Sequence, residues 1–529
     1  MTTPITISAD RQDPGRPFTH FWSTCVGAGR AAEGLRASWQ EHLRTVADAA
    51  GFRYVRFHGL LHDDMFVHRR NEDGPTVLNF QYVDDLFDRL LDAGVRPFVE
   101  LGFSPRDLAR DPSTTFWWKA NVAPPADLDA WADLVRRLVG HWLARYGRDE
   151  VRRWYFEVWN EPNLSPFFKG SKSEYFALYE ITARTLKDVD AELRVGGPAT
   201  SNFVPDARFA GEYEDTSQHA VVSEAADLDA LDWRPVWVED FLAFCHSRRL
   251  PVDFVSCHPY PTDWALDGHG TTRQHTRAAD ATTRDLRTLR RIVDTGPYPD
   301  AEIHLTEWNS SPSSRDHSHD HLQAATFVAR TVLESIGLVD SLAYWVFTDV
   351  FEEEGAGDTA FHGGFGMLTL QGVPKPVFHV YRMLHRLGGE LLARTEGAVV
   401  TRDSSDGSLS ALAYHYPPEV IQAPPGSFGS REVAEQTLAT GEPRLLKVEL
   451  TGLRPGAAVA VTTMDHTHGN ALAAWRGMGA PEPLTREQTA ALREAAHATG
   501  HEVRHADDAG RFLVEEAIAP WAVLLFAEL

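Results

Sequence analysis

A glutamate in a polar turn, Glu161, has the surroundings of a group that donates a proton in catalysis. It follows the bulky, β-prone run WYFEVW (154–159), lies between Asn160 and Pro162, and so comes where a strand ends. A carboxyl group held beside a tryptophan, a proline and an amide is in a setting that raises its pKa, as a general acid requires. A single Glu-Pro turn also suits a solvated glutamate, so the rest of the chain must decide.

A second glutamate, Glu307, ends a similar run, EIHLTEWN (302–309). Ile303, Leu305 and Glu307 alternate along this run, and we therefore expect Glu307 to end an apolar row that faces inward. Two carboxyl groups that face one cavity are what cleavage of a glycosidic bond requires. One protonates the leaving oxygen, and the other attacks the anomeric carbon or activates water.

The segment from 18 to 387 supplies elements that could bring these groups together. Strand-like runs alternate with helix-like runs in which apolar residues recur at steps of three and four. Eight such units predict an α/β fold of the (β/α)8 TIM barrel type, whose site lies at the carboxyl ends of the strands. The expected strands are 21–28, 54–59, 96–103, 154–161, 193–199, 252–260, 302–309 and 342–349. The loops after the second, third, fifth and eighth strands are long, as expected at the functional end.

In such a barrel Glu161 and Glu307 follow strands four and seven and face one cavity. These positions favour a separation of roughly 5–5.5 Å, and hence nucleophilic attack with retention of configuration. Ionised Glu307 would raise the pKa of Glu161 and keep it protonated until Glu307 is esterified to the sugar. Other strands also end in polar groups: His58, Asn160, His258 with Tyr260, and Asp349.

Outside the barrel the pattern changes to paired strands with Gly, Asp and Pro turns. We expect a β-sandwich accessory domain over 388–529, completed by an amino-terminal strand within 1–17. Within it, 417–443 is predicted to be a Pro/Gly-rich loop and 481–500 to contain an inserted helix. An acidic insert after the fifth barrel strand, 202–234, is predicted to be a surface excursion or a lid.

Composition limits the possible partners. The net charge of −24 over 529 residues argues against nucleic acid or an anionic membrane and favours a small neutral substrate. Three cysteines are too few and too scattered for a disulfide framework or a zinc site. The start of the chain lacks a basic segment followed by an apolar core, so we expect no secretory signal and a cytoplasmic enzyme.

With these residues placed, the chain resembles glycoside hydrolase family 39, the β-xylosidases and their relatives. The resemblance is carried along the barrel by VRFHGLLHDDM, RPFVELGF, FWWKANVAPP, FEVWNEPN, VGGPA, VDFVSCHPY, HLTEWNSS, and YWVFTDVFEE followed by FHGGFGM. It implies that Glu161 is the acid/base and Glu307 the nucleophile. It also implies a glycone pocket in which Asn160 contacts the sugar 2-hydroxyl, and which is lined by His58, His258, Tyr260, Phe116, Trp345 and Glu353.

The family resemblance implies a retaining exo-glycosidase acting on β-D-xylosides of xylo-oligosaccharides, as in xylan degradation, and it implies no cofactor and no metal ion. The insert 202–234, the HPY segment and the histidine-rich loop 316–321 depart from the xylosidase pattern. An arabinoside, galactoside or uronide substrate therefore stays open, as does a non-catalytic sugar-binding barrel. The loop 316–321 is expected to be flexible and polar rather than a metal site. Glu157 is expected to face inward as the partner of an arginine or a histidine.

Overall fold

The computed structural model describes residues 3–70, 74–201, 203, 232–266, 272–422 and 430–529. Eight parallel strands close into a barrel, which confirms the predicted fold class. In chain order they are β3 (Cys25–Arg30), β4 (Tyr54–His58), β7 (Arg96–Leu101), β10 (Tyr155–Val158), β11 (Arg194–Thr200), β12 (Phe254–Cys257), β15 (Glu302–Trp308) and β16 (Ser341–Tyr344). Each falls within or overlaps an expected strand, because every one is a buried apolar run bounded by turn residues.

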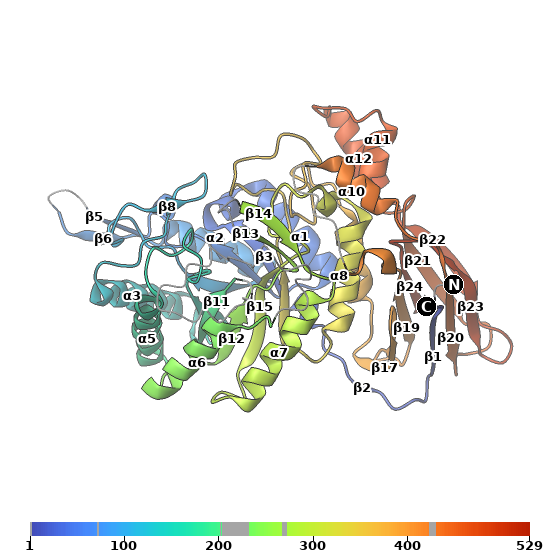
Figure 1. Cartoon of the computed structure of the whole chain (residues 1–529), viewed down its shortest axis with the longest axis horizontal. Coiled ribbons are helices and arrows are strands. Elements are labelled where there is room, and N and C mark those ends of the chain that lie inside the picture. Colours follow the sequence, from blue (N-terminus) through green and yellow to red (C-terminus); the bar gives the residue numbers. More distant parts are fainter. Residues whose placement is uncertain (1–2, 71–73, 202, 204–231, 267–271, 423–429) are drawn as a thin grey trace.

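Helices surround the barrel (Figure 1). The main ones are α1 (Ala37–Ala50), α2 (Gln81–Asp92), α3 (Leu128–Tyr146), α5 (Lys172–Val189), α6 (Val236–Arg248), α7 (Ala281–Thr295), α8 (Leu322–Glu334) and α9 (Pro376–His385), with a short α4 (Arg148–Val151) before β10. Their apolar faces and the outward side chains of the strands form one large hydrophobic cluster. Within the described residues, each helix is too short or too polar to cross a membrane.

The barrel interior is built in layers, as is usual for this fold. A small apolar layer contains Cys25, Phe98, Tyr155, Phe254 and Ala343, each from a different strand. His304 packs against three of these rings. Above that layer lie polar side chains, and the candidate site lies above them.

The inward row of β15 differs from the one expected. His304 and Thr306 face the interior, whereas Ile303 and Leu305 pack outward in the cluster shared with the helices. A register shift between Leu305 and Trp308 lets Glu307 reach the interior as well. The expectation of an apolar inward row was therefore wrong, although Glu307 does face the cavity, because a bulge re-aims the side chains that follow it.

Two sheets form a sandwich on one side of the barrel, with both chain termini in it (Figure 1). The smaller sheet has the order β1 (Ile5–Asp10), β20 (Arg444–Thr451), β23 (Phe512–Ile518). The larger has the order β2 (Arg16–Pro17), β17 (Glu390–Thr395), β18 (Ala398–Arg402), β19 (Leu409–Tyr414), β24 (Val523–Glu528), β21 (Ala458–Met464), β22 (Gly500–His505). Alternate apolar residues of both sheets share a hydrophobic core separate from the barrel's cluster.

The connecting segments hold further elements. Three two-stranded hairpins are β5 (His68–Arg70) with β6 (Thr76–Leu78), β8 (Thr114–Thr115) with β9 (Ala120–Asn121), and β13 (Thr262–Leu266) with β14 (Thr272–Thr276). The helix expected within 481–500 is α12 (Arg486–His497). With α11 (Ala471–Gly477) it packs against Phe361 and Val373, in the chain segment that follows β16. The sandwich part of the chain thereby supports a loop at the barrel mouth.

Two loop predictions need correction, and a third falls outside the described residues. Segment 417–443 is not loop throughout, because α10 (Arg431–Leu438) forms there, with the Ser430 side chain capping its first turn. Segment 316–321 is largely buried, and Asp320 pairs with the buried Lys375 at 2.8 Å. Most of the 202–234 insert lies outside the part of the chain that the structure describes.

Candidate active site

The turn after β10 places Glu161 by an unusual backbone conformation. Trp159 and Glu161 have φ angles of 72° and 42°, in the left-handed region that costs a non-glycine residue about 1–3 kcal/mol. The Glu161 amide donates to the Ala199 carbonyl at 2.8 Å, and the Trp159 indole donates to the Phe167 carbonyl at 2.8 Å. Neighbouring loops thus hold the strained turn and point the carboxyl group inward.

Glu161 and Glu307 meet across the barrel mouth. Single side-chain atoms of Glu161, His258 and Glu307 all lie within 4.8 Å of one another. Nδ1 of His258 is 3.0 Å from Oε1 of Glu161 and 3.9 Å from Oε1 of Glu307. Each glutamate is only 6% exposed. The two carboxyl groups therefore lie in one buried cluster at the barrel mouth, with an imidazole between them.

Arg56, on β4, organises the charges beneath this cavity and is fully buried. Its Nη1 donates to Glu307 Oε1 at 2.7 Å and its Nε to Glu157 Oε2 at 2.6 Å. Its Nη2 donates to Asn160 Oδ1 at 2.8 Å and lies 3.0 Å from Glu100 Oε2. Glu157 faces inward with an arginine partner, as expected. One guanidinium thus contacts three buried carboxylates and orients the amide beside Glu161.

Aromatic rings form the wall next to Glu307. His58 lies 3.4 Å from Glu307 through Nε2, and its ring is flanked by Trp345 at 4.9 Å and Phe116 at 6.1 Å between centroids. Tyr260 donates its hydroxyl to Glu307 Oε2 at 3.4 Å. The structure therefore places His58 and Tyr260 at the Glu307 carboxylate and Phe116 and Trp345 beside the His58 ring, although the four come from different strand ends or loops.

Burial changes the proton affinities in the cavity. It raises the pKa of Glu307 above its ordinary value of 4.5, while Arg56 and His58 act in the opposite direction. Burial, and then the charge of Glu307, raises the pKa of Glu353 well above the usual range. The Glu353 carbonyl accepts the Trp117 amide at 2.8 Å, next to Phe116, whose ring stacks on that of His58. This backbone contact joins the predicted pocket residue Glu353 to the wall beside His58.

Two carboxylates and an imidazole at this spacing have the composition of a metal site as well as of an acid–base site. Arg56 already donates to Glu307 at 2.7 Å, so that a further cation at the same oxygen would meet a fixed positive charge. We therefore interpret the cluster of Glu161, His258 and Glu307 as acid–base machinery, which glycosidic bond cleavage by two carboxyl groups requires.

Comparison with known proteins decides the family. The sequence model described as Glycosyl hydrolases family 39 matches residues 5–217 and 225–512. The chain belongs to this family. It is 37% identical over 503 residues to a β-xylosidase of Geobacillus stearothermophilus, covering 93% of this chain and 89% of that protein. It is 36% identical over 478 residues to a β-xylosidase of Caldicellulosiruptor saccharolyticus, covering 90% and 88%.

The solved structures agree with the sequence match. A monomeric β-xylosidase from Caulobacter crescentus superposes with a TM-score of 0.83 at 31% identity, covering 99% of each chain. The likeness thus extends over the barrel and the sandwich together. This family 39 protein is a glycoside hydrolase.

Three residues of this family 39 site were not predicted from the sequence: Arg56, Glu100 and Thr306. Arg56 had a visible signal, because it stands in the apolar run YVRFH two residues before His58 and shares its parity. A lone arginine in a buried strand needs an acidic partner. Thr306 had none, because the expected inward row was Ile303, Leu305 and Glu307, whereas His304 and Thr306 face the interior and a register shift brings Glu307 there as well.

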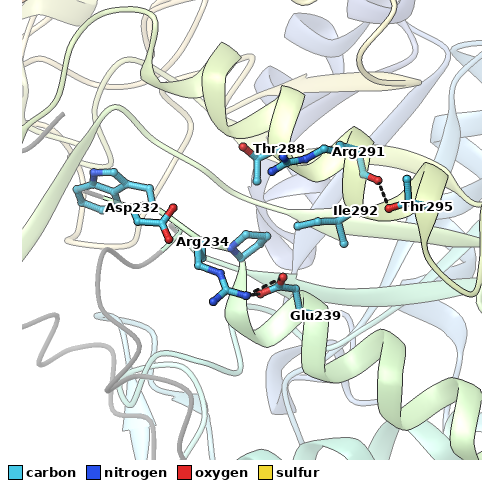
Figure 2. A pocket seen from close by; sticks show the side chains of 9 residues that line it. Asp232, Arg234, Glu239, Thr288, Arg291, Ile292 and Thr295 are labelled. Carbon is cyan, nitrogen blue, oxygen red and sulfur yellow. Dashed lines mark hydrogen bonds and ion pairs between the residues drawn. The ribbon is translucent and has the colours of Figure 1, made fainter. Parts of the chain in front are cut away.

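A second cavity lies away from the family 39 site, on the outside of the barrel between α6 and α7 (Figure 2). Trp233, Arg234 and Thr288 are among the residues that line it. Arg234 is paired with Glu239 at 2.8 Å, and the cavity contains none of the predicted site residues.

Proposed function

We propose that this family 39 hydrolase is a retaining β-xylosidase that removes terminal xylose from the non-reducing end of short xylo-oligosaccharides. The observation that carries the proposal is the meeting of Glu161 and Glu307 within 4.8 Å in one cavity. So short a separation leaves no room for a water molecule between nucleophile and sugar, and it therefore favours direct attack by a carboxylate.

In the first step Glu307 attacks the anomeric carbon while the Glu161 carboxyl group gives its proton to the departing oxygen. The glycosidic C–O bond breaks, the leaving alcohol departs with that proton, and an ester joins the sugar to Glu307. In the second step Glu161 takes a proton from water, whose oxygen attacks the anomeric carbon. The ester bond breaks, Glu307 is again a carboxylate, and Glu161 is protonated again.

The burial of both glutamates supports action at a chain end. Glu161 and Glu307 are buried, and the rings of Phe116 and Trp345 stand beside His58. The segment after β16 is backed by α11 and α12. A pocket of this kind suits one terminal sugar, with the leaving group outside, better than the middle of a long polymer.

The charges of the cavity support a neutral sugar. The Glu307 carboxylate faces it, and Arg56 is already engaged with carboxylates. Arg315, the cation nearest to Glu307 in sequence, donates to the Ser314 carbonyl at 2.9 Å and to the carbonyl of Gly355 at 3.4 Å. A uronic acid would meet repulsion here. The two relatives named as β-xylosidases support xylose among the neutral sugars.

A panel of nitrophenyl glycosides tests the proposal. We expect the highest kcat/KM on the β-D-xyloside, and lower values on the arabinoside, galactoside and glucuronide. A higher value on another glycoside would replace xylose and keep the mechanism. Binding of xylose without hydrolysis of any glycoside would favour the non-catalytic sugar-binding barrel. The cytoplasmic location stays a prediction, checked by fractionation of the producing cell.

A further inference from the structure

We propose that Thr306 and Glu157 form a hydrogen-bond relay that fixes the tautomer of His258 and thereby holds the acid proton on Glu161. The inference rests on the proposed roles of Glu161 and Glu307. It concerns positioning residues, since neither Thr306 nor Glu157 touches the substrate. Their action passes through His258.

The direction of the relay follows from counting its protons. Arg56 donates to Oε2 of Glu157 at 2.6 Å, so Glu157 is an ionised acceptor. Thr306 has a single hydroxyl proton, which it donates to Oε1 of Glu157 at 2.7 Å. The Thr306 oxygen also lies 2.8 Å from Nε2 of His258. Since its proton is already used, Thr306 accepts there, and Nε2 must carry a proton.

The other ring nitrogen then faces Glu161. A neutral His258 with its proton on Nε2 has a bare lone pair on Nδ1, 3.0 Å from Oε1 of Glu161. This contact is a hydrogen bond only if Glu161 is the protonated partner and donates. A carboxylate there would place two acceptors face to face, which is costly in a buried site. The relay therefore selects the carboxylic acid form of Glu161.

The surroundings keep His258 neutral rather than cationic. Burial, the charge of Arg56 and then His58 lower its pKa well below the usual value. Glu307 opposes this effect, with its nearer oxygen 3.9 Å from Nδ1. Tyr260 faces Glu307 through its neutral hydroxyl. Among the described residues, the titratable and charged groups around the pair include Arg56 and His58 on β4, Glu100 on β7, Glu157 on β10, Tyr260 after β12, Glu307 on β15 and Glu353 after β16.

The same lone pair serves both steps of hydrolysis. Before the first step it accepts the proton of Glu161 and keeps that group an acid. After Glu161 has lost its proton, the facing lone pair makes the carboxylate a stronger base toward the incoming water. In a chain without the relay, His258 could move its proton to Nδ1, donate to Glu161 and stabilise the carboxylate. The acid would then be lost at a lower pH.

The test replaces the hydroxyl without changing the shape of the side chain. In Thr306→Val we expect the alkaline limb of kcat/KM to move to lower pH. At neutral pH kcat/KM should fall about tenfold or more on phenyl β-xyloside, whose leaving group is poor and needs the proton. On the dinitrophenyl xyloside, whose leaving group departs without it, the fall should be less than about threefold. Thr306→Ser keeps the hydroxyl and should restore the alkaline limb. Equal losses on both substrates with an unmoved limb would overturn the relay.

A second measurement needs neither Thr306→Val nor the substrate. In the wild-type protein labelled with ¹⁵N histidine, the ring of His258, assigned by the signals lost in His258→Asn, should show a proton on Nε2 and an unprotonated Nδ1. A proton on Nδ1 would overturn the proposal even if Thr306→Val does not fold. An enzyme that prefers another glycoside would leave the ¹⁵N measurement unchanged, and the first test would use the phenyl and dinitrophenyl forms of that glycoside. The failure of the relay and the failure of the xylosidase assignment are therefore distinguishable.

Discussion

Nη1 of Arg56 lies 2.7 Å from Oε1 of Glu307, and both groups are buried at the top of the barrel interior. Glu100 and Glu157 contact the same guanidinium. Arg56 therefore has two roles. It lowers the free-energy cost of burying Glu100 and Glu157, and it orients Glu307, the group proposed as nucleophile.

Replacing Arg56 with methionine tests how much Arg56 contributes to the stability of the fold. The change leaves buried carboxylates without their cation, and we expect the free energy of unfolding to fall by about 3–5 kcal/mol, measured by urea titration. Arg137→Met is the matched control. Arg137 pairs with Asp133 on the surface of α3, and its loss should cost less than about 1 kcal/mol. Similar losses in the two variants would contradict the account of Arg56.

Glu307→Ala should abolish hydrolysis of every glycoside. We expect kcat to fall by about 10⁴-fold or more, even on dinitrophenyl xyloside, because no other group can form the ester. Glu487→Ala, an exposed glutamate on α12, is the control and should keep full activity. If the Glu307 variant kept activity within tenfold of wild type, another group would be the nucleophile.

Glu161→Ala should separate substrates by their leaving group. Phenyl β-xyloside needs the proton and should lose about 10²–10⁴-fold in kcat/KM, while dinitrophenyl xyloside should change little. Azide should then raise the turnover of the activated substrate and yield a glycosyl azide, because this anion attacks without a general base. Equal losses on both substrates, with no effect of azide, would refute the acid/base role.

The acid limb of the pH profile reports Glu307. Activity requires its carboxylate, and burial raises its pKa above 4.5, so kcat/KM should fall as the pH falls through a value above 4.5. His58 lowers the pKa of Glu307, and His58→Gln should therefore move this limb to higher pH. A wild-type limb at or below 4.5, or a shift to lower pH in His58→Gln, would contradict the electrostatic account.

Much of the fold could be predicted because each barrel strand is a buried run with a helix pattern behind it. The positions of Glu161 just after strand four and of Glu307 near the end of strand seven followed from that alternation. The rest depended on distant contacts. The bulge between Leu305 and Trp308 reverses the parity of β15, and no local pattern marks it.

Segment 316–321 is a loop whose structure also depends on a distant contact and could not be predicted from its local sequence. Its six polar residues suit an exposed loop, yet His319, Asp320 and His321 are buried. The partner that makes this possible, Lys375, lies far along the chain and also contacts Asp349 at 2.7 Å. A buried lysine with two aspartates can be seen only when the loops after β15 and β16 are placed together.

The most direct test of the central proposal is to trap the ester on Glu307. In a 2-deoxy-2-fluoro xyloside the fluorine slows both the formation and the hydrolysis of the ester. A good leaving group speeds only the formation, so the ester should accumulate on the protein. Mass spectrometry should then show one added fluoroxylosyl group per chain, located in the peptide that contains Glu307. A label on a different residue, or continued turnover with no covalent adduct, would contradict the proposed mechanism.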